Sequence, residues 1–91
     1  MPFKISFGTK FKHGFKTIKK RGYPIEQLIE VFDLLEMNGT LPRKYIPHKL
    51  SGNYADCWEC HIKPDWLLIW ECNETSKDIR FIRTGTHADM F

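Results

Sequence analysis

Residues 57–72 read CWECHIKPDWLLIWEC, two short apolar segments on either side of a break at Lys63-Pro64-Asp65. Cys57 to Ile62 and Trp66 to Cys72 each have the length of a β-strand, and the break between them is typical of a turn. A polar stretch then leads to a third strand-like segment, Ile79 to Thr84. Three strands with short connections predict an antiparallel meander.

Upstream of the meander, the sequence predicts a short strand and a first helix. Apolar and polar residues alternate from Phe3 to Phe7, which is the period of a strand. Beyond this point the apolar side chains recur every three or four residues, at Phe7, Phe11, Phe15 and Ile18. This spacing indicates the apolar stripe of a helix, although Gly14 inside it weakens the pattern.

A second helix is predicted between Pro24 and Asn38. Proline is tolerated in a first helical turn because its missing N–H would lack a partner there anyway, and Asn38-Gly39 is typical of a helix end. The residues expected to be buried are Ile25, Leu28, Ile29, Phe32 and Leu35.

Together these elements predict an α+β fold, in which an N-terminal strand and a two-helix hairpin pack on a mostly antiparallel sheet. The two helices are expected to run antiparallel because only a short connection separates them. Residues 40–53 contain two prolines and are predicted to form a loop that supplies functional groups rather than core.

Length and composition restrict the class of protein. With 91 residues, 42% of them hydrophobic, the chain is expected to form a single domain over residues 1–91, too small for separate cofactor and substrate domains. It contains no apolar run of the roughly 18 residues that span a bilayer, and no continuous apolar stretch typical of a signal peptide. Three cysteines is an odd number for a disulfide framework. We therefore expect a cytoplasmic protein with reduced thiols and no membrane association.

Charge is distributed unevenly along the chain. Residues 1–24 carry seven Lys or Arg and no acid, whereas residues 25–38 carry four acids and no base. A cationic segment favours a polyanion or an acidic protein as partner. The alternative is a solvated helix face, and charge alone does not separate the two interpretations.

The cysteines offer three interpretations. Residues 57–61, CWECH, fit the C-x-x-C-H pattern of c-type haem attachment, but that reaction normally follows export. A zinc site from Cys57, Cys60, Cys72 and a histidine is the second interpretation, although no second Cys or His pair stands at ligand spacing. The third, which we favour, is that Cys60 and Cys72 are small buried apolar residues.

Three of the four histidines flank the predicted strands. His48 lies in the loop before the meander, His61 at the end of one strand and His87 just past the last strand, with Asp65 in the turn near His61. A meander brings such edge positions to one end of a sheet. Imidazoles titrate near about 6.5, so this set suits general acid–base chemistry at neutral pH.

Cleavage of RNA is a reaction that uses such a set. One group takes the proton of the ribose 2′-OH, another protonates the leaving 5′-oxygen, and a cation such as Arg83 stabilises charge on the phosphate. Basic loop residues, Lys49 among them, are expected to follow the RNA backbone. Aromatic residues such as Trp66 and Phe91 offer surfaces on which bases stack, although core positions explain most of the aromatic residues equally well.

Three ordered blocks of sequence resemble one protein family. HKLSG (48–52), CHIKPDWLLI (60–69) and RTGTHADMF (83–91) resemble the YafQ-type branch of the RelE/ParE toxin superfamily. The predicted first strand and two helices also suit the layout of this family. The resemblance therefore covers nearly the whole chain.

The resemblance implies a toxin of a type II toxin–antitoxin pair that cleaves mRNA on the ribosome without a metal or other cofactor. It implies that the catalytic residues are His48, His61, Asp65 and His87. By this analogy His87 is the general acid, His48 or His61 the base, and Asp65 the residue that orients an imidazole. Arg83 holds the phosphate and Phe91 helps to place the substrate.

The resemblance also implies partners. They are a cognate antitoxin that is acidic in part, the ribosome with its mRNA, and operator DNA reached only through the toxin–antitoxin complex. Two alternatives remain open at this point. ParE-like relatives share the fold and inhibit gyrase by contact, and a Cys/His metal- or haem-binding domain is the third class.

Overall fold

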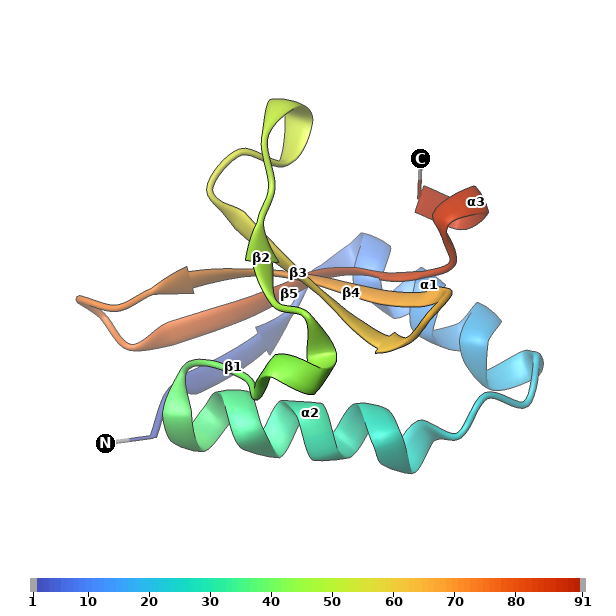
Figure 1. Ribbon diagram of the computed structural model, residues 1–91, viewed down its shortest axis with the longest axis horizontal. Helices are drawn as coiled ribbons and strands as arrows, with labels where there is room; N and C mark the ends of the chain where they lie inside the picture. Colours follow the sequence, from blue (N-terminus) through green and yellow to red (C-terminus); the bar gives the residue numbers. More distant parts are fainter. Residues whose placement is uncertain (1, 91) are drawn as a thin grey trace.

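The computed structural model describes residues 2–90 as helices and strands around one five-stranded sheet (Figure 1). The elements are β1 (Lys4–Phe7), α1 (Thr9–Lys20), α2 (Ile25–Asn38), β2 (His48–Lys49), β3 (Cys57–Lys63), β4 (Trp66–Asn73), β5 (Asp78–Gly85) and α3 (His87–Met90). The strand order is β1-β5-β4-β3-β2, and only β1 and β5 are parallel. The predicted α+β class and the meander β3-β4-β5 are confirmed.

The central strand β4 explains the continuous apolar run in the sequence. Trp66, Leu68 and Trp70 belong to the main core cluster with α1 and α2, whereas Leu67 and Ile69 belong to a second cluster. Successive side chains of a strand point to opposite faces, so a strand covered on both faces is apolar throughout. The second cluster includes Met90, which shows that α3 covers part of the face opposite the two long helices.

Helix α1 packs against β5 more closely than its sequence suggests. It begins at Thr9, so Phe7 belongs to β1 and not to the helix, and its buried residues are Phe11 and Ile18. A side chain at Gly14 would clash with the backbone carbonyl of Thr84. The glycine that weakens the helical pattern is therefore the residue that lets the helix approach the sheet.

Helix α2 ends as predicted, but its buried stripe differs from the prediction. Gly39 has a left-handed φ of 72° and donates its N–H to the Leu35 carbonyl. The buried residues are Leu28, Val31 and Leu35, whereas Ile29 is 50% exposed. Positions three and seven residues after Leu28 share its face, and Ile29 is rotated about 100° away from it.

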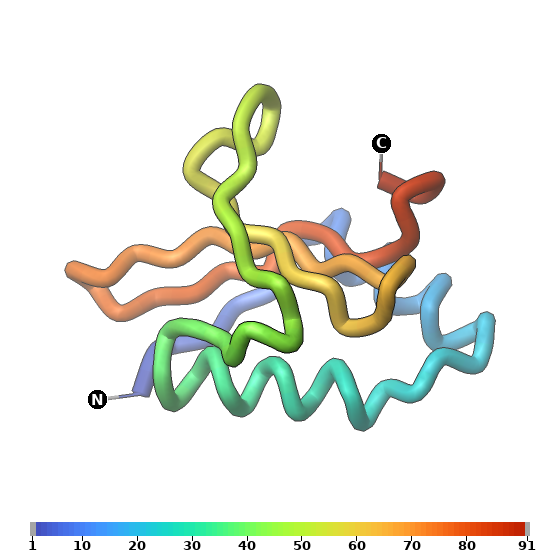
Figure 2. The backbone as a smooth tube through the Cα atoms, in the orientation of Figure 1, coloured from blue at the N-terminus to red at the C-terminus, as the bar shows by residue number. Residues whose placement is uncertain are grey.

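Residues 40–53 are not purely loop, which corrects the prediction. They contain two short 3₁₀ turns and strand β2, whose two residues pair antiparallel with β3. Figure 2 shows this segment crossing the edge of the sheet and projecting on the side away from α2, the side on which α3 also lies. A two-residue strand is too short to produce a recognisable alternation. Among residues 2–90, no helix is long and apolar enough to cross a membrane.

Candidate active site

Three imidazoles form a row on the face of the sheet opposite α1 and α2. His48 on β2, His61 on β3 and His87 at the start of α3 follow one another, with ring centroids 6.1 Å and 6.2 Å apart. The register explains the row: His48 pairs with Glu59 and His61 pairs with Leu67, and side chains of directly paired residues share a face. The fold thus assembles the three histidines that the sequence places 13 and 26 positions apart.

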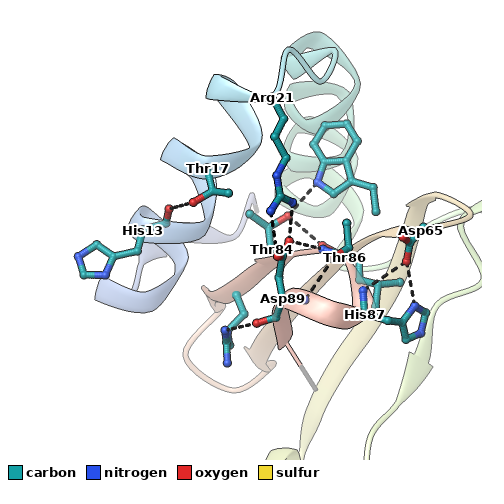
Figure 3. Close-up of polar contacts among 11 residues, drawn as sticks. His13, Thr17, Arg21, Asp65, Thr84, Thr86, His87 and Asp89 are labelled. Atoms are coloured by element: carbon teal, nitrogen blue, oxygen red, sulfur yellow. Dashed lines mark hydrogen bonds and ion pairs between the residues drawn. The ribbon is translucent and has the colours of Figure 1, made fainter.

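The outermost imidazole, His87, is held by Asp65 (Figure 3). One carboxylate oxygen of Asp65 accepts the backbone N–H of His87 at 3.3 Å and lies 3.2 Å from its Nδ1. The side-chain contact with His87, reinforced by the backbone contact, holds the pKa of Asp65 below its usual value. Both side chains are well exposed, 58% for His87 and 69% for Asp65.

The middle imidazole, His61, has a defined tautomer. Its Nδ1 lies 3.2 Å from the carbonyl oxygen of Pro64. A carbonyl only accepts hydrogen bonds, so Nδ1 carries the hydrogen and Nε2 of the neutral ring carries the lone pair. In the neutral ring of His61, Nε2 is therefore the nitrogen that can accept a proton.

The third imidazole, His48, has both ring nitrogens against acceptors. Nδ1 lies 2.9 Å from the carbonyl oxygen of Ile46, and Nε2 lies 3.1 Å from Oε1 of Glu59. Both ring nitrogens therefore face oxygens that accept hydrogen bonds, and an imidazole donates to both only when each nitrogen carries a hydrogen. Glu59 is buried, and within residues 2–90 its Oε2 has no hydrogen-bond partner.

Arg83 lies on the same face as the histidine row. It pairs with Ile69 on β4, and Ile69 pairs with Glu59 on β3. Its guanidinium donates to the Tyr54 hydroxyl at 3.1 Å and to the Asp89 carbonyl at 3.2 Å. Arg83 is thus a cation held in place on the same sheet face as the three imidazoles.

The comparisons with known proteins show the family and the fold. Residues 3–91 match the family described as the bacterial toxin of type II toxin–antitoxin system, YafQ. This chain belongs to the YafQ family. The mRNA interferase toxin YafQ of Escherichia coli K12 is 36% identical over 89 residues, which cover 96% of this chain and 94% of that protein.

Solved structures of YafQ from Escherichia coli have the same fold. A crystal structure of a YafQ mutant matches with a TM-score of 0.90 and 32% identity, covering 98% of each chain. YafQ in the DinJ–YafQ toxin–antitoxin complex matches with a TM-score of 0.89 and 33% identity, covering 100% of this chain and 99% of the other.

Of the predicted substrate-binding residues, Trp66 and Lys49 lie away from the histidine row, and the prediction for Phe91 stays untested. Trp66 is fully buried and donates its indole N–H to the Thr84 hydroxyl at 3.0 Å, so it is a core residue and offers no stacking surface. Lys49 pairs with Trp58 and lines a hollow of about 540 Å³ on the face away from the histidines. Phe91 lies outside the described residues.

The cysteines of this YafQ family member do not form a site within residues 2–90. Cys57 and Cys60 belong to clusters on opposite faces of the sheet, and no three His, Cys, Asp or Glu side chains of the described residues converge to hold a metal. Burial raises the pKa of both thiols, and of partly buried Cys72. Cys60 is confirmed as a buried core residue.

Sequence reasoning missed several residues that hold the site. Glu59, Tyr54 and Asp89 contact His48 or Arg83. Only Glu59 gave a signal, since a carboxylate inside an otherwise apolar strand needs a partner. Tyr54 lies in a short 3₁₀ turn and Asp89 near the end of the chain, and the hydrophobic periodicity of a sequence does not predict contacts between such segments.

Proposed function

We propose that this YafQ family toxin is an endoribonuclease that cleaves mRNA on the ribosome through the ribose 2′-OH. The observation that carries the proposal is the row of three imidazoles with a carboxylate at one end and Arg83 on the same face. These groups supply a base, an acid and a cation, which are what the reaction needs. The relative named mRNA interferase supports this reaction class.

His61 is the proposed general base. Its Nε2 takes the proton of the 2′-OH, and the 2′-oxygen attacks the adjacent phosphorus. The hydrogen bond from Nδ1 to the Pro64 carbonyl supports this role because it places the lone pair on Nε2. His48 is a poorer base in this arrangement, because both its nitrogens already face acceptors.

His87 is the proposed general acid. Asp65 accepts the Nδ1 hydrogen, so the proton for the leaving 5′-oxygen is carried on Nε2. The bond from phosphorus to the 5′-oxygen breaks as that oxygen is protonated. The products are a 2′,3′-cyclic phosphate, which hydrolyses to a 3′-phosphate, and a 5′-OH end.

Arg83 and His48 have supporting roles in the proposal. The Arg83 guanidinium stabilises the charge that gathers on the non-bridging phosphate oxygens. The His48 ring, in contact with Glu59, lies beside the His61 ring with 6.1 Å between their centroids, and it contributes a second imidazole to the binding surface. No step of the proposed chemistry uses a metal.

Partners follow from the family and the charge distribution. We propose a cognate antitoxin that is acidic in part, as YafQ of Escherichia coli has DinJ in its complex. The exposed lysines of α1 suit rRNA or mRNA on the ribosome. Operator DNA is reached only through the toxin–antitoxin complex, and the site of action is the cytoplasm, where ribosomes are.

The test is cleavage of a defined mRNA in a reconstituted translation system, with and without ribosomes and with EDTA present at a level that leaves ribosomes intact. We expect cuts that need ribosomes and persist with the chelator. Intact mRNA under conditions where the protein is folded would contradict the proposal, and inhibition of gyrase by the same preparation would favour the ParE-like alternative.

A further inference from the structure

An ion pair ties the end of α1 to the chain segment that carries His87. Arg21 donates from Nη1 to Oδ2 of Asp89 at 2.7 Å and from Nη2 to Oδ1 at 3.1 Å, across 68 positions of sequence (Figure 3). Both carboxylate oxygens are engaged, and this bidentate geometry restricts the orientation of the carboxylate as well as its position.

Asp89 is also fixed from inside its own segment. Its Oδ2 accepts the backbone N–H of Thr86 at 2.9 Å, while the Thr86 hydroxyl accepts the backbone N–H of Asp89 at 3.2 Å. This reciprocal pair caps the start of α3. Arg83 holds the Asp89 carbonyl, so the same residue is bound through its side chain, its N–H and its carbonyl.

Helix α3 needs such external contacts to keep one position. It has only four residues, far below the roughly 12 that give an isolated helix measurable stability. Met90 anchors one side of it in the second core cluster. His87 is its first residue, so the direction of the imidazole follows from how this short helix is held.

Gly85 provides the space in which Asp89 sits. A Cβ built on Gly85 would lie 3.0 Å from both Cβ and Oδ2 of Asp89. Any side chain at position 85 would therefore push against the carboxylate that Arg21 binds. The end of β5 and the start of α3 are shaped around this contact.

We propose that Arg21 and Asp89 form a clamp that positions His87 for proton transfer, an inference that rests on the proposed function. Neither residue touches the reacting atoms; both act through the placement of α3. Arg21 holds the pKa of Asp89 well below its usual range, so the clamp stays charged at every pH where imidazoles titrate. Misplacement of a catalytic group by about 1 Å costs on the order of 100-fold in rate.

The test compares two variants with opposite effects on charge. Arg21→Gln removes a positive charge and Asp89→Asn removes a negative one, and Asn retains an oxygen that accepts the Thr86 N–H. Glu30→Gln is the control for loss of a charge, since it replaces an exposed carboxylate of α2, outside the proposed RNA-binding and catalytic groups, with an amide. Single-turnover cleavage of ribosome-bound mRNA is measured at several toxin concentrations.

We expect both clamp variants to cleave about 10-fold more slowly at saturation, with an unchanged half-saturating concentration, and Glu30→Gln to cleave at the wild-type rate. The double variant should be no slower than either single variant, because both break one contact. Wild-type rates in both clamp variants would overturn the proposal. So would opposite effects of the two variants, which would indicate attraction of RNA rather than positioning.

A second readout separates positioning from stability and from the proposed function itself. The imidazole resonances of His87 in the folded protein should shift in Arg21→Gln and Asp89→Asn but not in Glu30→Gln, while those of His48 stay in place. A slower reaction with unshifted His87 resonances would overturn the clamp. If the wild type fails to cleave mRNA, the proposed function fails, and these resonances still decide whether the ion pair places His87.

Discussion

The two ends of the histidine row carry the same chemical pair in opposite surroundings. At one end His48 faces Glu59 at 3.1 Å, and at the other His87 faces Asp65 at 3.2 Å. The Glu59 side chain is 6% exposed, whereas that of Asp65 is 69% exposed. Each pair thus joins an imidazole to a carboxylate at nearly the same distance, but the carboxylate of one pair is buried and that of the other is exposed to water.

Because of this difference in burial, we expect the two pairs to have different roles. A buried carboxylate that loses its partner leaves a polar group unpaired and desolvated, so we expect the His48–Glu59 contact to stabilise the fold around it. An exposed pair contributes little to stability because water screens it. In the proposed mechanism His87 gives its proton to the substrate and regains it from solvent, while Asp65 orients the ring.

The largest effect is expected when His87 is removed. His87→Ala should lower the single-turnover cleavage rate by about 10²- to 10⁴-fold, the usual contribution of a general acid or base. The melting temperature should barely change, because the side chain is exposed.

His13→Ala is the matched control for the loss of a histidine. His13 is exposed on α1 and belongs to no part of the row, so its removal should leave the cleavage rate unchanged. Equal cleavage by His87→Ala and wild type would remove His87 from the mechanism.

A smaller effect on rate is expected at the exposed carboxylate. Asp65→Asn should slow cleavage about 10-fold, because an amide holds the Nδ1 hydrogen of His87 more weakly than a carboxylate does. The melting temperature should remain within about a degree of wild type, since exposed pairs contribute little. A large loss of stability would show that this pair is structural, contrary to the comparison.

The buried carboxylate should give the opposite result. Glu59→Gln leaves a buried amide N–H₂ without an acceptor and weakens the bond to His48, so we expect a loss of about 1–2 kcal/mol in the free energy of unfolding. For a domain of this size, each kcal/mol of lost stability lowers Tm by roughly 4–8 °C. Thermal or denaturant unfolding measures it. An unchanged stability would contradict the account of Glu59.

The pH dependence separates Asp65 from the imidazoles. Contact with His87 lowers the pKa of Asp65, so its contribution to stability is present above pH ~4 and is lost only as pH falls through the lowered value. The carboxylate is then charged throughout pH 5–8. An acidic limb of the rate profile in that range belongs to an imidazole and should persist in Asp65→Asn; its disappearance would contradict this assignment.

The smallest expected signal comes from a thiol beside the buried pair. Burial, and then the charge of Glu59, raises the pKa of Cys60. The native protein should therefore not be alkylated at Cys60 by iodoacetamide at pH 8, as mass spectrometry would show, while the unfolded chain is. Rapid native alkylation would mean that water reaches this part of the core.

Sequence patterns predicted the helices and strands that have strong periodicity. They did not predict the surroundings of individual side chains, which depend on single contacts in the folded chain. The apolar run Trp66 to Trp70 predicted a buried strand, and the turn before it placed Asp65 near His61. The same pattern offered Trp66 as a stacking surface, because periodicity does not tell which aromatic residue faces solvent. The sequence also did not show that Lys49 lies on the opposite face from His48, because alternation over a two-residue strand is not recognisable as a pattern.

The pairing of carboxylates with imidazoles was also beyond the sequence. Glu59 and His48 become neighbours only through the pairing of β2 with β3, and Asp65 and His87 only through the return of β5 to the turn. The order of the three blocks nevertheless identified the family, and it predicted three histidines that the fold places in one row. The separate roles proposed for His61 and His87 could be argued only from their hydrogen-bond contacts in the structure.

The measurement that tests the division of labour most directly uses a modified leaving group. An mRNA whose scissile 5′-oxygen is replaced by sulfur has a leaving group that departs without protonation, so it no longer needs a general acid. On this substrate, in ribosome complexes, His87→Ala should regain most of the wild-type rate, whereas His61→Ala should remain slow because it lacks the base. Equal impairment of the two variants on the modified substrate would contradict the assignment of His87 as acid and His61 as base.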